Sequence, residues 1–361
     1  MKIISIVGTR PEIIRLSIIF KKLDKFFDHK IIHTGQNFTK ELNEIFFEEL
    51  NLREPDFNLN IIEPNFSSQV GKILKKTEKI LLKEKPDKLL ILGDTNSGLT
   101  SIIAQRLQIP VYHLEAGNRC FDNRVPEECN RRIIDHSSDI LMPYTSRSKE
   151  NLVNEGFKRS KIFIVGNPIT EVLNTYEKEI NNSKVLSKMK VKKNKYFLVT
   201  LHRAENVDSK KRLKIFIDSF LKLSDDYKMP FIISAHPRLI HRISDLNYDF
   251  DKNKLILATP FSLFDFIKLE KNSFCVLTDS GTVQEECCIF NIPNVTIRDV
   301  TERPETLEAG SNIISGCNLN SIVDSVSIAV NTSTEWVSPK EYQVKNTSDI
   351  VVKILQSKSP K

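Results

Sequence analysis

The sequence lacks the features that would point to several common classes of protein. In its 361 residues no apolar run reaches the length of about 18 residues that a membrane-spanning helix needs. Six cysteines occur, but none forms a CxxC pair or alternates with histidine at zinc spacing, so reduced thiols are expected. No GxxxxGK[ST], no GxGxxG after a predicted strand and no HExxH occurs, which argues against a P-loop ATPase, a nicotinamide cofactor and a zinc hydrolase.

The N-terminal residues 1–7 are apolar and β-like, without the layout of a cleavable signal, and cytoplasmic localisation is expected. A formal net charge of +7 comes largely from lysines scattered on predicted helix faces and gathered at 184–195 and 340–361. These are either solvated faces or a general attraction for anionic ligands. No basic cluster is interleaved with aromatic residues, so a nucleic-acid partner is not predicted, and neither is membrane insertion.

Short apolar runs alternate with amphipathic stretches along the chain, which is typical of an α/β protein with parallel sheets. The first series has expected strands at 2–7, 30–33, 88–92, 110–113 and 162–165, and expected helices at 12–25, 39–50, 70–81, 97–107 and 127–136. The second series has expected strands at 196–200, 231–234, 254–258, 274–277 and 294–297. The length suits two domains. We therefore predict two doubly wound, Rossmann-like domains at 1–166 and 167–338, with a C-terminal helix at 339–357 packing back on the first.

Charged side chains gather where the predicted strands of the first domain end. Arg10 follows the first strand, and Thr9 and Glu12 have the spacing of a capping box. With Arg15, this helix start suits an anion, and a well-capped helix with surface arginines is the alternative. Ligands of doubly wound domains bind at the carboxyl ends of the strands, here expected in a cleft between the domains.

Three carboxylates could form one acidic cluster at these strand ends. Asp94 follows the strand at 88–92, where it serves either as a catalytic group or as a helix N-cap. Glu115 follows the strand at 110–113, and Glu127 opens the next helix, where the helix dipole alone favours an acidic residue. Crowded carboxylates shift each other's pKa values apart and so create acid/base pairs.

The second domain has similar candidates. His202 follows the strand at 196–200 and can exchange protons near neutrality, whereas His236, after 231–234, is as consistent with a structural role. The hydroxyls and backbone N–H groups at the helix start after 274–277 suit a diphosphate, and a glutamate one turn later suits ribose hydroxyls. These residues are Ser280, Gly281, Thr282 and Glu286. Arg303 lies in a charged loop after the last strand, which either binds an anion or forms a surface ion-pair network.

Together these motifs resemble the non-hydrolysing UDP-N-acetylglucosamine 2-epimerases over roughly residues 2–316. The ordered set is Gly-Thr-Arg-Pro-Glu at 8–12, Gly-Asp-Thr at 93–95, Glu-Ala-Gly-x-Arg at 115–119, Pro-Glu-Glu-x-Asn-Arg at 126–131, His-Arg-x-Glu-Asn at 202–206, Asp-Ser-Gly-x-x-Gln-Glu-Glu at 279–286 and Thr-Glu-Arg-Pro-Glu at 301–305. The resemblance implies the GT-B architecture, a UDP-sugar substrate, no cofactor or metal, and a homodimer.

The resemblance also implies roles for individual residues. Asp94, Glu115, Glu127 and His202 match the catalytic acid/base positions. Arg10 matches a position near the diphosphate; Ser280, Gly281 and Glu286 match diphosphate and ribose contacts; His236 lines the cleft; and Phe266 matches the aromatic that stacks near uracil. The implied activity converts UDP-N-acetylglucosamine to UDP-N-acetylmannosamine by elimination and re-addition of UDP, for capsule or O-antigen supply.

Some positions depart from the usual family pattern. Arg15 stands where the family often has lysine, and the loop at 118–125 is shorter than in common members. That loop is more like the subgroup that makes UDP-N-acetyl-L-fucosamine from the L-talose epimer, which is the first alternative. A GT-B glycosyltransferase or a hydrolysing epimerase is the second, and a catalytically silent UDP-sugar-binding regulator is the third. Gln36 resembles a residue of the family's regulatory site, but its surroundings differ here.

Overall fold

The computed structural model describes residues 1–35, 40–63, 65–246 and 248–358, without the side chains of 40–44; Gln36 lies outside this part of the chain. The chain divides into two compact units. Unit 1 comprises Met1–Thr175 and Lys340–Lys361, and unit 2 comprises Tyr176–Pro339. The boundary predicted from the sequence, after residue 166, lies earlier in the chain.

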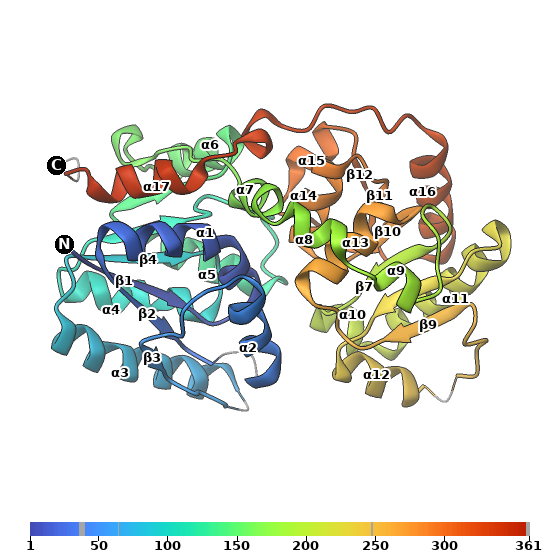
Figure 1. The fold of residues 1–361 in the computed structure, drawn as a ribbon, viewed down its shortest axis with the longest axis horizontal. Helices are drawn as coiled ribbons and strands as arrows, with labels where there is room; N and C mark the ends of the chain where they lie inside the picture. The colour runs from blue at the N-terminus through green and yellow to red at the C-terminus, as the bar shows by residue number, and fades with distance from the viewer. Residues whose placement is uncertain (36–39, 64, 247, 359–361) are drawn as a thin grey trace. The chain divides into compact units, whose positions relative to one another are not determined.

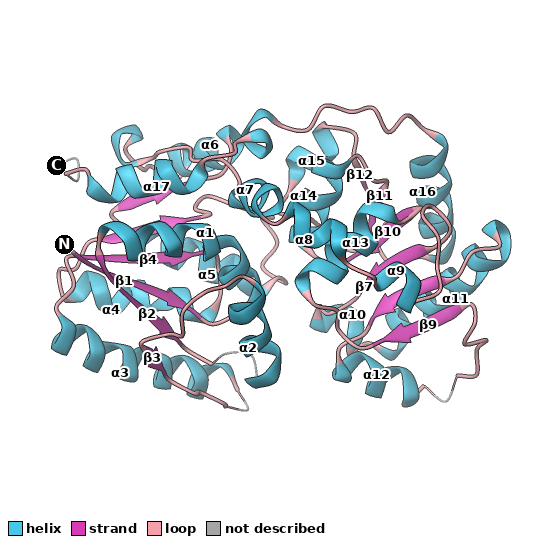
Figure 2. Cartoon of the chain, in the orientation of Figure 1, coloured by secondary structure: helices cyan, strands magenta, loops and turns pink. Residues whose placement is uncertain are grey.

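Unit 1 is built on a parallel sheet with the strand order β3-β2-β1-β4-β5-β6. Its strands are β1 (Lys2–Val7), β2 (Asp28–His33), β3 (Phe57–Asn58), β4 (Lys88–Leu92), β5 (Val111–Leu114) and β6 (Ile140–Met142). Its α-helices are α1 (Arg10–Phe26), α2 (Lys40–Glu49), α3 (Phe66–Glu84), α4 (Ser101–Arg106), α5 (Pro126–His136), α6 (Ser146–Asn154), α7 (Pro168–Thr175) and α17 (Thr347–Gln356). Short 3₁₀ turns are η1 (Asn96–Thr100), η2 (Arg159–Lys161) and η3 (Lys340–Gln343). Every residue of β4 and β5 is buried, because helices cover both faces of the sheet (Figure 2).

Unit 2 repeats this architecture with the strand order β12-β11-β10-β7-β8-β9, again parallel. Its strands are β7 (Phe197–Thr200), β8 (Phe231–Ser234), β9 (Leu255–Ala258), β10 (Cys275–Thr278), β11 (Asn294–Thr296) and β12 (Asn312–Ile314). Its helices are α8 (Glu177–Asn182), α9 (Val185–Lys188), α10 (Ala204–Val207), α11 (Lys210–Tyr227), α12 (Pro237–Ser244), α13 (Leu263–Asn272), α14 (Gly281–Phe290), α15 (Pro304–Glu308) and α16 (Leu319–Asn331). The aromatic rings of Phe197 and Phe231 stack at 4.4 Å in its core.

The C-terminal segment returns to unit 1 as two pieces rather than the single helix expected at 339–357. The turn η3 is joined to unit 1 by the backbone, since the N–H of Asn167 donates to the carbonyl of Glu341 at 3.0 Å. The helix α17 then packs beside α1 and α7 (Figure 1). Its last turn is closed by Lys88, whose buried ammonium donates to the carbonyls of Leu355 at 2.5 Å and Ser357 at 3.0 Å. These two anchors leave residues 344–346 as a connecting bend.

Two other predictions about the elements need correction. The strand expected at 162–165 is wrong: only Ile162 forms a bridge, to Leu141. The N–H groups of Phe163 and Val165 still donate to the carbonyls of Leu141 and Pro143 at 2.9 and 3.1 Å, so this apolar run lies beside β6 without forming a regular strand. The helix expected at 97–107 begins as the 3₁₀ turn η1 before α4. The short strands β3, β6 and β12 were not predicted, because runs of two or three residues show no periodicity.

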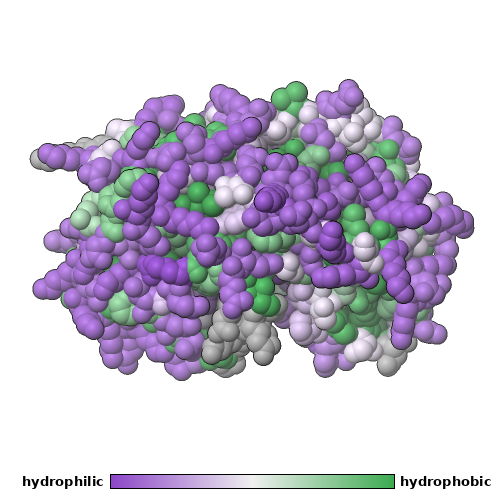
Figure 3. Space-filling view, in the orientation of Figure 1, coloured by the Kyte–Doolittle hydropathy of each residue, from purple (hydrophilic) through white to green (hydrophobic). Residues whose placement is uncertain are grey.

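The surface is mostly hydrophilic on the face drawn in Figure 3. The large apolar side chains with the greatest exposure, Val337 and Phe121, belong to different units and stand as single exposed residues. Among the described residues, no helix combines the length and apolar character that crossing a bilayer requires.

Candidate functional site

The predicted carboxylates of unit 1 follow two adjacent strands. β4 pairs with β5 so that Leu92 lies opposite Leu114, and Asp94 and Glu115 therefore leave the sheet at the same edge. Gly93 makes this possible, since its φ of +72° turns the chain sharply after β4. A Cβ atom on Gly93 would lie 3.7 Å from Glu115 Oε2, so the two strand exits are in close contact.

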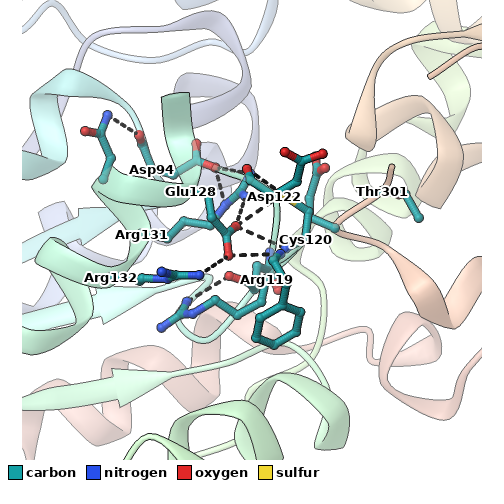
Figure 4. Close-up of polar contacts among 12 residues, drawn as sticks. Asp94, Arg119, Cys120, Asp122, Glu128, Arg131, Arg132 and Thr301 are labelled. Atoms are coloured by element: carbon teal, nitrogen blue, oxygen red, sulfur yellow. Dashed lines mark hydrogen bonds and ion pairs between the residues drawn. The ribbon is translucent and has the colours of Figure 1, made fainter. Parts of the chain in front are cut away.

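Arg131 of α5 joins Asp94 to a second carboxylate, Glu128 (Figure 4). Its Nε and Nη2 lie 2.8 and 2.7 Å from Asp94 Oδ2, and its Nη1 lies 2.7 Å from Glu128 Oε2. A planar guanidinium suits such divided contacts, which a lysine ammonium cannot reproduce. Asp94 was predicted to be either a catalytic group or a helix N-cap. The N-cap residue of the following turn is Thr95, and the Asp94 side chain is paired with Arg131 instead.

Glu128 anchors the loop that leads into α5. Its carboxylate is fully buried and accepts the backbone N–H groups of Cys120 and Phe121 at 3.0 and 3.1 Å. Burial raises the pKa of Glu128, but the Cys120 N–H and the Arg131 guanidinium outweigh it and hold the pKa below its ordinary value. Glu127, the predicted catalytic residue, is half-buried in the first turn of the same helix. An ionised Glu128 therefore fixes the loop that leads into the helix in which Glu127 lies.

Glu115 lies among three polar side chains from other parts of unit 1. Arg15 Nη1 is 2.5 Å from Glu115 Oε2, the Tyr144 hydroxyl donates to the same oxygen at 3.1 Å, and Asn118 donates to Oε1 at 3.1 Å. Arg15 is buried, and its guanidinium also lies over the Tyr144 ring. The φ of Glu115 is +70°, a strained value for a residue with a side chain. The structure thus gives Arg15 a carboxylate partner, where the sequence suggested a phosphate.

The turn after β1 forms the predicted capping box. Glu12 Oε2 accepts the N–H groups of Gly8 and Thr9 at 2.9 and 2.7 Å, and its Oε1 accepts the Thr95 hydroxyl at 2.9 Å. Burial raises the pKa of Glu12 to about 7, against the opposing effect of these donors. Arg10, at the start of α1, lies over the Phe46 ring at 4.9 Å. The bond to Thr95 ties the β1 turn to the β4 turn that carries Asp94.

In unit 2, His202 follows β7 and contacts a carboxylate that the sequence had not singled out. Its Nδ1 lies 3.0 Å from Oδ1 of Asp279, which follows β10. Asp279 is fully buried and also accepts the backbone N–H groups of His202 and Arg203 at 3.0–3.1 Å. Burial opposes ionisation, but His202 and these donors lower the pKa of Asp279 to about 2. The half-exposed imidazole is therefore oriented by a buried anion, the arrangement expected of a proton-transfer group.

The predicted diphosphate contacts lie at the start of α14. Ser280 is the N-cap residue, and its own N–H donates to the Thr278 hydroxyl at 2.9 Å. A Cβ atom on Gly281 would lie 2.6 Å from Glu302 Oε1, so a larger residue there would have to displace the Glu302 carboxylate. Thr282 follows and is half-buried. His236 is the N-cap residue of α12, where its Nδ1 accepts the N–H of Arg238 at 3.3 Å.

The remaining candidates of unit 2 are largely buried. Glu286 is buried against Glu270 of α13, and burial together with the neighbouring Glu286 carboxylate raises the pKa of Glu270 well above its ordinary value. Arg303 is buried with its Nε 2.5 Å from Glu285 Oε1. Phe266 is also buried in α13, at 7% exposure, which leaves only a small part of it accessible.

No group of three or more His, Cys, Asp or Glu side chains that could hold a metal ion occurs among the residues that the structure describes. A sequence model of the family described as UDP-N-acetylglucosamine 2-epimerase matches residues 21–356. The chain belongs to the UDP-N-acetylglucosamine 2-epimerase family. The resemblance predicted from the ordered motifs is thereby confirmed.

Individual members of this epimerase family are similar over nearly the whole chain. A relative from Methanocaldococcus jannaschii, named UDP-N-acetylglucosamine 2-epimerase, is 45% identical over 94% of this chain and 95% of its own. A relative from Pseudomonas aeruginosa, named UDP-2,3-diacetamido-2,3-dideoxy-D-glucuronate 2-epimerase, is 36% identical over 90% of this chain and 91% of its own. The crystal structure of the M. jannaschii epimerase in complex with UDP-GlcNAc and UDP has a TM-score of 0.93 at 43% identity, over 99% of each chain. The predicted fold class, two Rossmann-like α/β domains of the GT-B type, is confirmed.

Three residues that contact the candidate groups of the two units were quoted in sequence motifs but given no role. Arg131 and Glu128 fix Asp94 and the loop before α5, and Asp279 orients His202. A role for Asp279 could have been predicted, because it follows a predicted buried strand as Asp94 does. The signal for Arg131 was weaker, because an arginine in a helix is usually solvated and its partner Asp94 lies 37 residues away.

Proposed function

We propose that this protein is a non-hydrolysing 2-epimerase that interconverts UDP-N-acetylglucosamine and UDP-N-acetylmannosamine. Membership of the family and the names of its relatives support this activity. The observation that carries it is the pair of carboxylates after β4 and β5, each ion-paired with a buried arginine. Ion pairing favours the ionised form of a carboxylate, which can accept a proton.

The chemistry requires more than removal of a proton. The C2 proton of an N-acetylhexosamine has no adjacent carbonyl, so direct removal would leave an unstabilised carbanion. In the proposed reaction a base takes the proton from C2 while the C1–O bond breaks and its electron pair leaves with UDP. The C1=C2 double bond of 2-acetamidoglucal forms. UDP then adds back to C1 as an acid delivers a proton to the opposite face of C2, without a metal or redox cofactor.

We assign proton transfer to four groups and UDP binding to the others. The proton-transfer groups are Asp94, Glu115, Glu127 and His202. The UDP-binding groups are Arg10, Arg15, His236, Phe266, Ser280, Gly281, Thr282, Glu286 and Arg303. Support differs among them. Asp94 is oriented by Arg131, and His202 by Asp279. Arg15, by contrast, is paired with Glu115, so it must give up that contact before it can bind a phosphate.

Incubation of the purified protein with UDP-N-acetylglucosamine in deuterium oxide tests the proposal. We expect NMR to show UDP-N-acetylmannosamine with deuterium at C2, and we expect Asp94→Asn and Glu115→Gln to lose most of that incorporation. Transfer to an acceptor, or free sugar and UDP as the main products, would instead identify a glycosyltransferase or a hydrolysing epimerase. Binding without any turnover would identify a regulator.

A different sugar is the second candidate. The Pseudomonas aeruginosa relative is named for a 2,3-diacetamido glucuronate, so the family accommodates changes at C3 and C6. The short loop at 118–125, which Glu128 holds through Cys120 and Phe121, also points to the L-talose-configured substrate. Parallel assays with the three UDP-sugars decide which has the highest kcat/KM.

We further propose that the protein acts as a homodimer in the cytoplasm and supplies an activated sugar for a surface polysaccharide. Family resemblance supports the dimer, and the use of a UDP-sugar supports the location. Light scattering after size-exclusion chromatography should give twice the 41.5 kDa mass of the chain. A mass of one chain at assay concentration would contradict the dimer.

A further inference from the structure

A buried charged cluster lies behind the two turns that carry Asp94 and Glu115. We call it the His113 cluster, and it contains His113, Arg119, Asp135 and Glu155. His113 and Asp135 are at most 1% exposed, and His113 Nδ1 lies 2.8 Å from Asp135 Oδ1. Arg119 Nη2 lies 2.7 Å from Asp135 Oδ2 and 2.6 Å from Glu155 Oε2. The cluster is thus a chain of alternating basic and acidic groups.

The partners of the imidazole define its protonation state. His113 Nε2 lies 2.9 Å from the carbonyl oxygen of Gly93, which only accepts, so Nε2 carries a proton. On the other side, Asp135 accepts from Arg119 and from the Gly117 N–H at 3.2 Å, which favours a carboxylate. His113 Nδ1 then carries a proton as well. A doubly protonated His113 also balances the charge, because two cations then face two carboxylates.

The cluster contacts each of the two turns at a glycine. Gly93 immediately precedes Asp94, and Gly117 comes two residues after Glu115. Both glycines have positive φ, +72° and +80°, a backbone conformation that residues with a side chain rarely adopt. The His113 side chain fixes the carbonyl of the first, and the Asp135 side chain fixes the N–H of the second.

We propose that His113 and Asp135 are positioning residues for the epimerisation: their ion pair holds the two side chains in place, and their contacts with Gly93 and Gly117 set the conformation of the turns that carry Asp94 and Glu115. The inference rests on the proposed function for its kinetic consequences. Neither side chain is assigned to contact the sugar. Their effect is on the alignment of the carboxylates with C2, and a displacement of about 1 Å in such an alignment lowers turnover about a hundredfold.

Two substitutions of His113 separate its contacts. His113→Gln retains an N–H near the Nε2 position, toward Gly93, whereas His113→Asn retains one near Nδ1, toward Asp135. We expect His113→Asn to lower kcat about tenfold to a hundredfold with KM changed less than about twofold, and His113→Gln to recover most of kcat. The exposed His136 of α5 is the matched control, and His136→Gln should leave kcat and KM unchanged.

A spectroscopic measurement keeps the proposal testable if a variant fails to fold. In the wild-type protein, ¹⁵N NMR should show protons on both ring nitrogens of His113, and Asp135→Asn should remove the proton from Nδ1. An unprotonated ring nitrogen in the wild type, equal kcat in the two His113 variants, or a loss confined to KM would each overturn the proposal. A wild-type protein inactive on every UDP-sugar would refute the proposed function, while the NMR result would still decide the charged pair.

Discussion

At the scale of single residues, Arg131 contacts two carboxylates of unit 1. It joins Asp94 to the fully buried Glu128. We expect Arg131→Met to lower the free energy of unfolding by about 3 kcal/mol, because Glu128 would lose its main counterion in a buried position. Urea denaturation measures this change.

Arg132 provides a matched control for Arg131. It also contacts Glu128, at 3.4 Å, but its side chain is 43% exposed. Arg132→Met should therefore change the free energy of unfolding by less than about 1 kcal/mol. Equal losses in the two variants would contradict the view that Arg131 is the counterion of Glu128.

Asp279 makes the free energy of unfolding of unit 2 depend on pH in the acid range. Its pKa falls from 3.8 to about 2 on folding, which corresponds to about 2 kcal/mol. Because the folded-state pKa is the lower one, this contribution is present above pH 3.8 and is lost as the pH falls through about 2. The stability difference between wild type and Asp279→Asn should accordingly shrink by about 2 kcal/mol over that range in urea titrations monitored on unit 2. A constant difference would show that Asp279 is not selectively stabilised as an anion.

Contacts between individual residues could be predicted from the sequence where the two partners are close together in the chain. Thr9 and Glu12 are three positions apart, and their contact was predicted as a capping box. Arg131 with Asp94, and His202 with Asp279, are separated by 37 and 77 residues. Only the packing of strands and helices brings such partners together, so their spacing in the sequence does not predict these contacts.

At the scale of elements, Gly117 limits how β5 can pass into the next loop. A Cβ atom there would lie 2.2 Å from the backbone oxygen of Ser148 in α6, and the φ is +80°. We expect Gly117→Ala to destabilise unit 1 by about 3 kcal/mol, since both backbone strain and a backbone clash arise. Thermal or urea unfolding measures it.

Gly156 isolates the effect of backbone strain alone. Its φ is +94°, and a Cβ atom there would meet nothing within 4 Å. Gly156→Ala should consequently cost only about 1 kcal/mol. If Gly117→Ala were no worse than Gly156→Ala, the contact between the β5 turn and α6 would be looser than the structure indicates.

Element prediction succeeded where runs were long and failed where they were short. β4 was placed at its observed bounds, because five consecutive buried positions between turn residues leave little choice. β6 has three residues and was missed, and the apolar run beginning at Ile162 was taken for a strand although it forms only one bridge. Short edge segments owe their conformation to neighbouring strands, which local sequence does not specify.

At the scale of the whole molecule, the C-terminal helix α17 completes unit 1. Its contacts with α1 and the closure of its last turn by Lys88 both lie within that unit. A chain ending at Asn346 should show faster amide hydrogen exchange in α1 and α7, while β7 and β8 of unit 2 keep their protection. The full-length Lys88→Met variant should show a smaller effect in the same direction, and uniform exchange in both units would contradict a local role.

The return of the chain to unit 1 has a consequence for biosynthesis. The ribosome makes α17 only after every residue of unit 2 has been made. The nascent chain can therefore bury the core of the second unit while the first still lacks its final helix and exposes the face of α1 that α17 will cover. A translation pause or early termination between unit 2 and α17 should leave an aggregation-prone unit 1 attached to a well-folded unit 2.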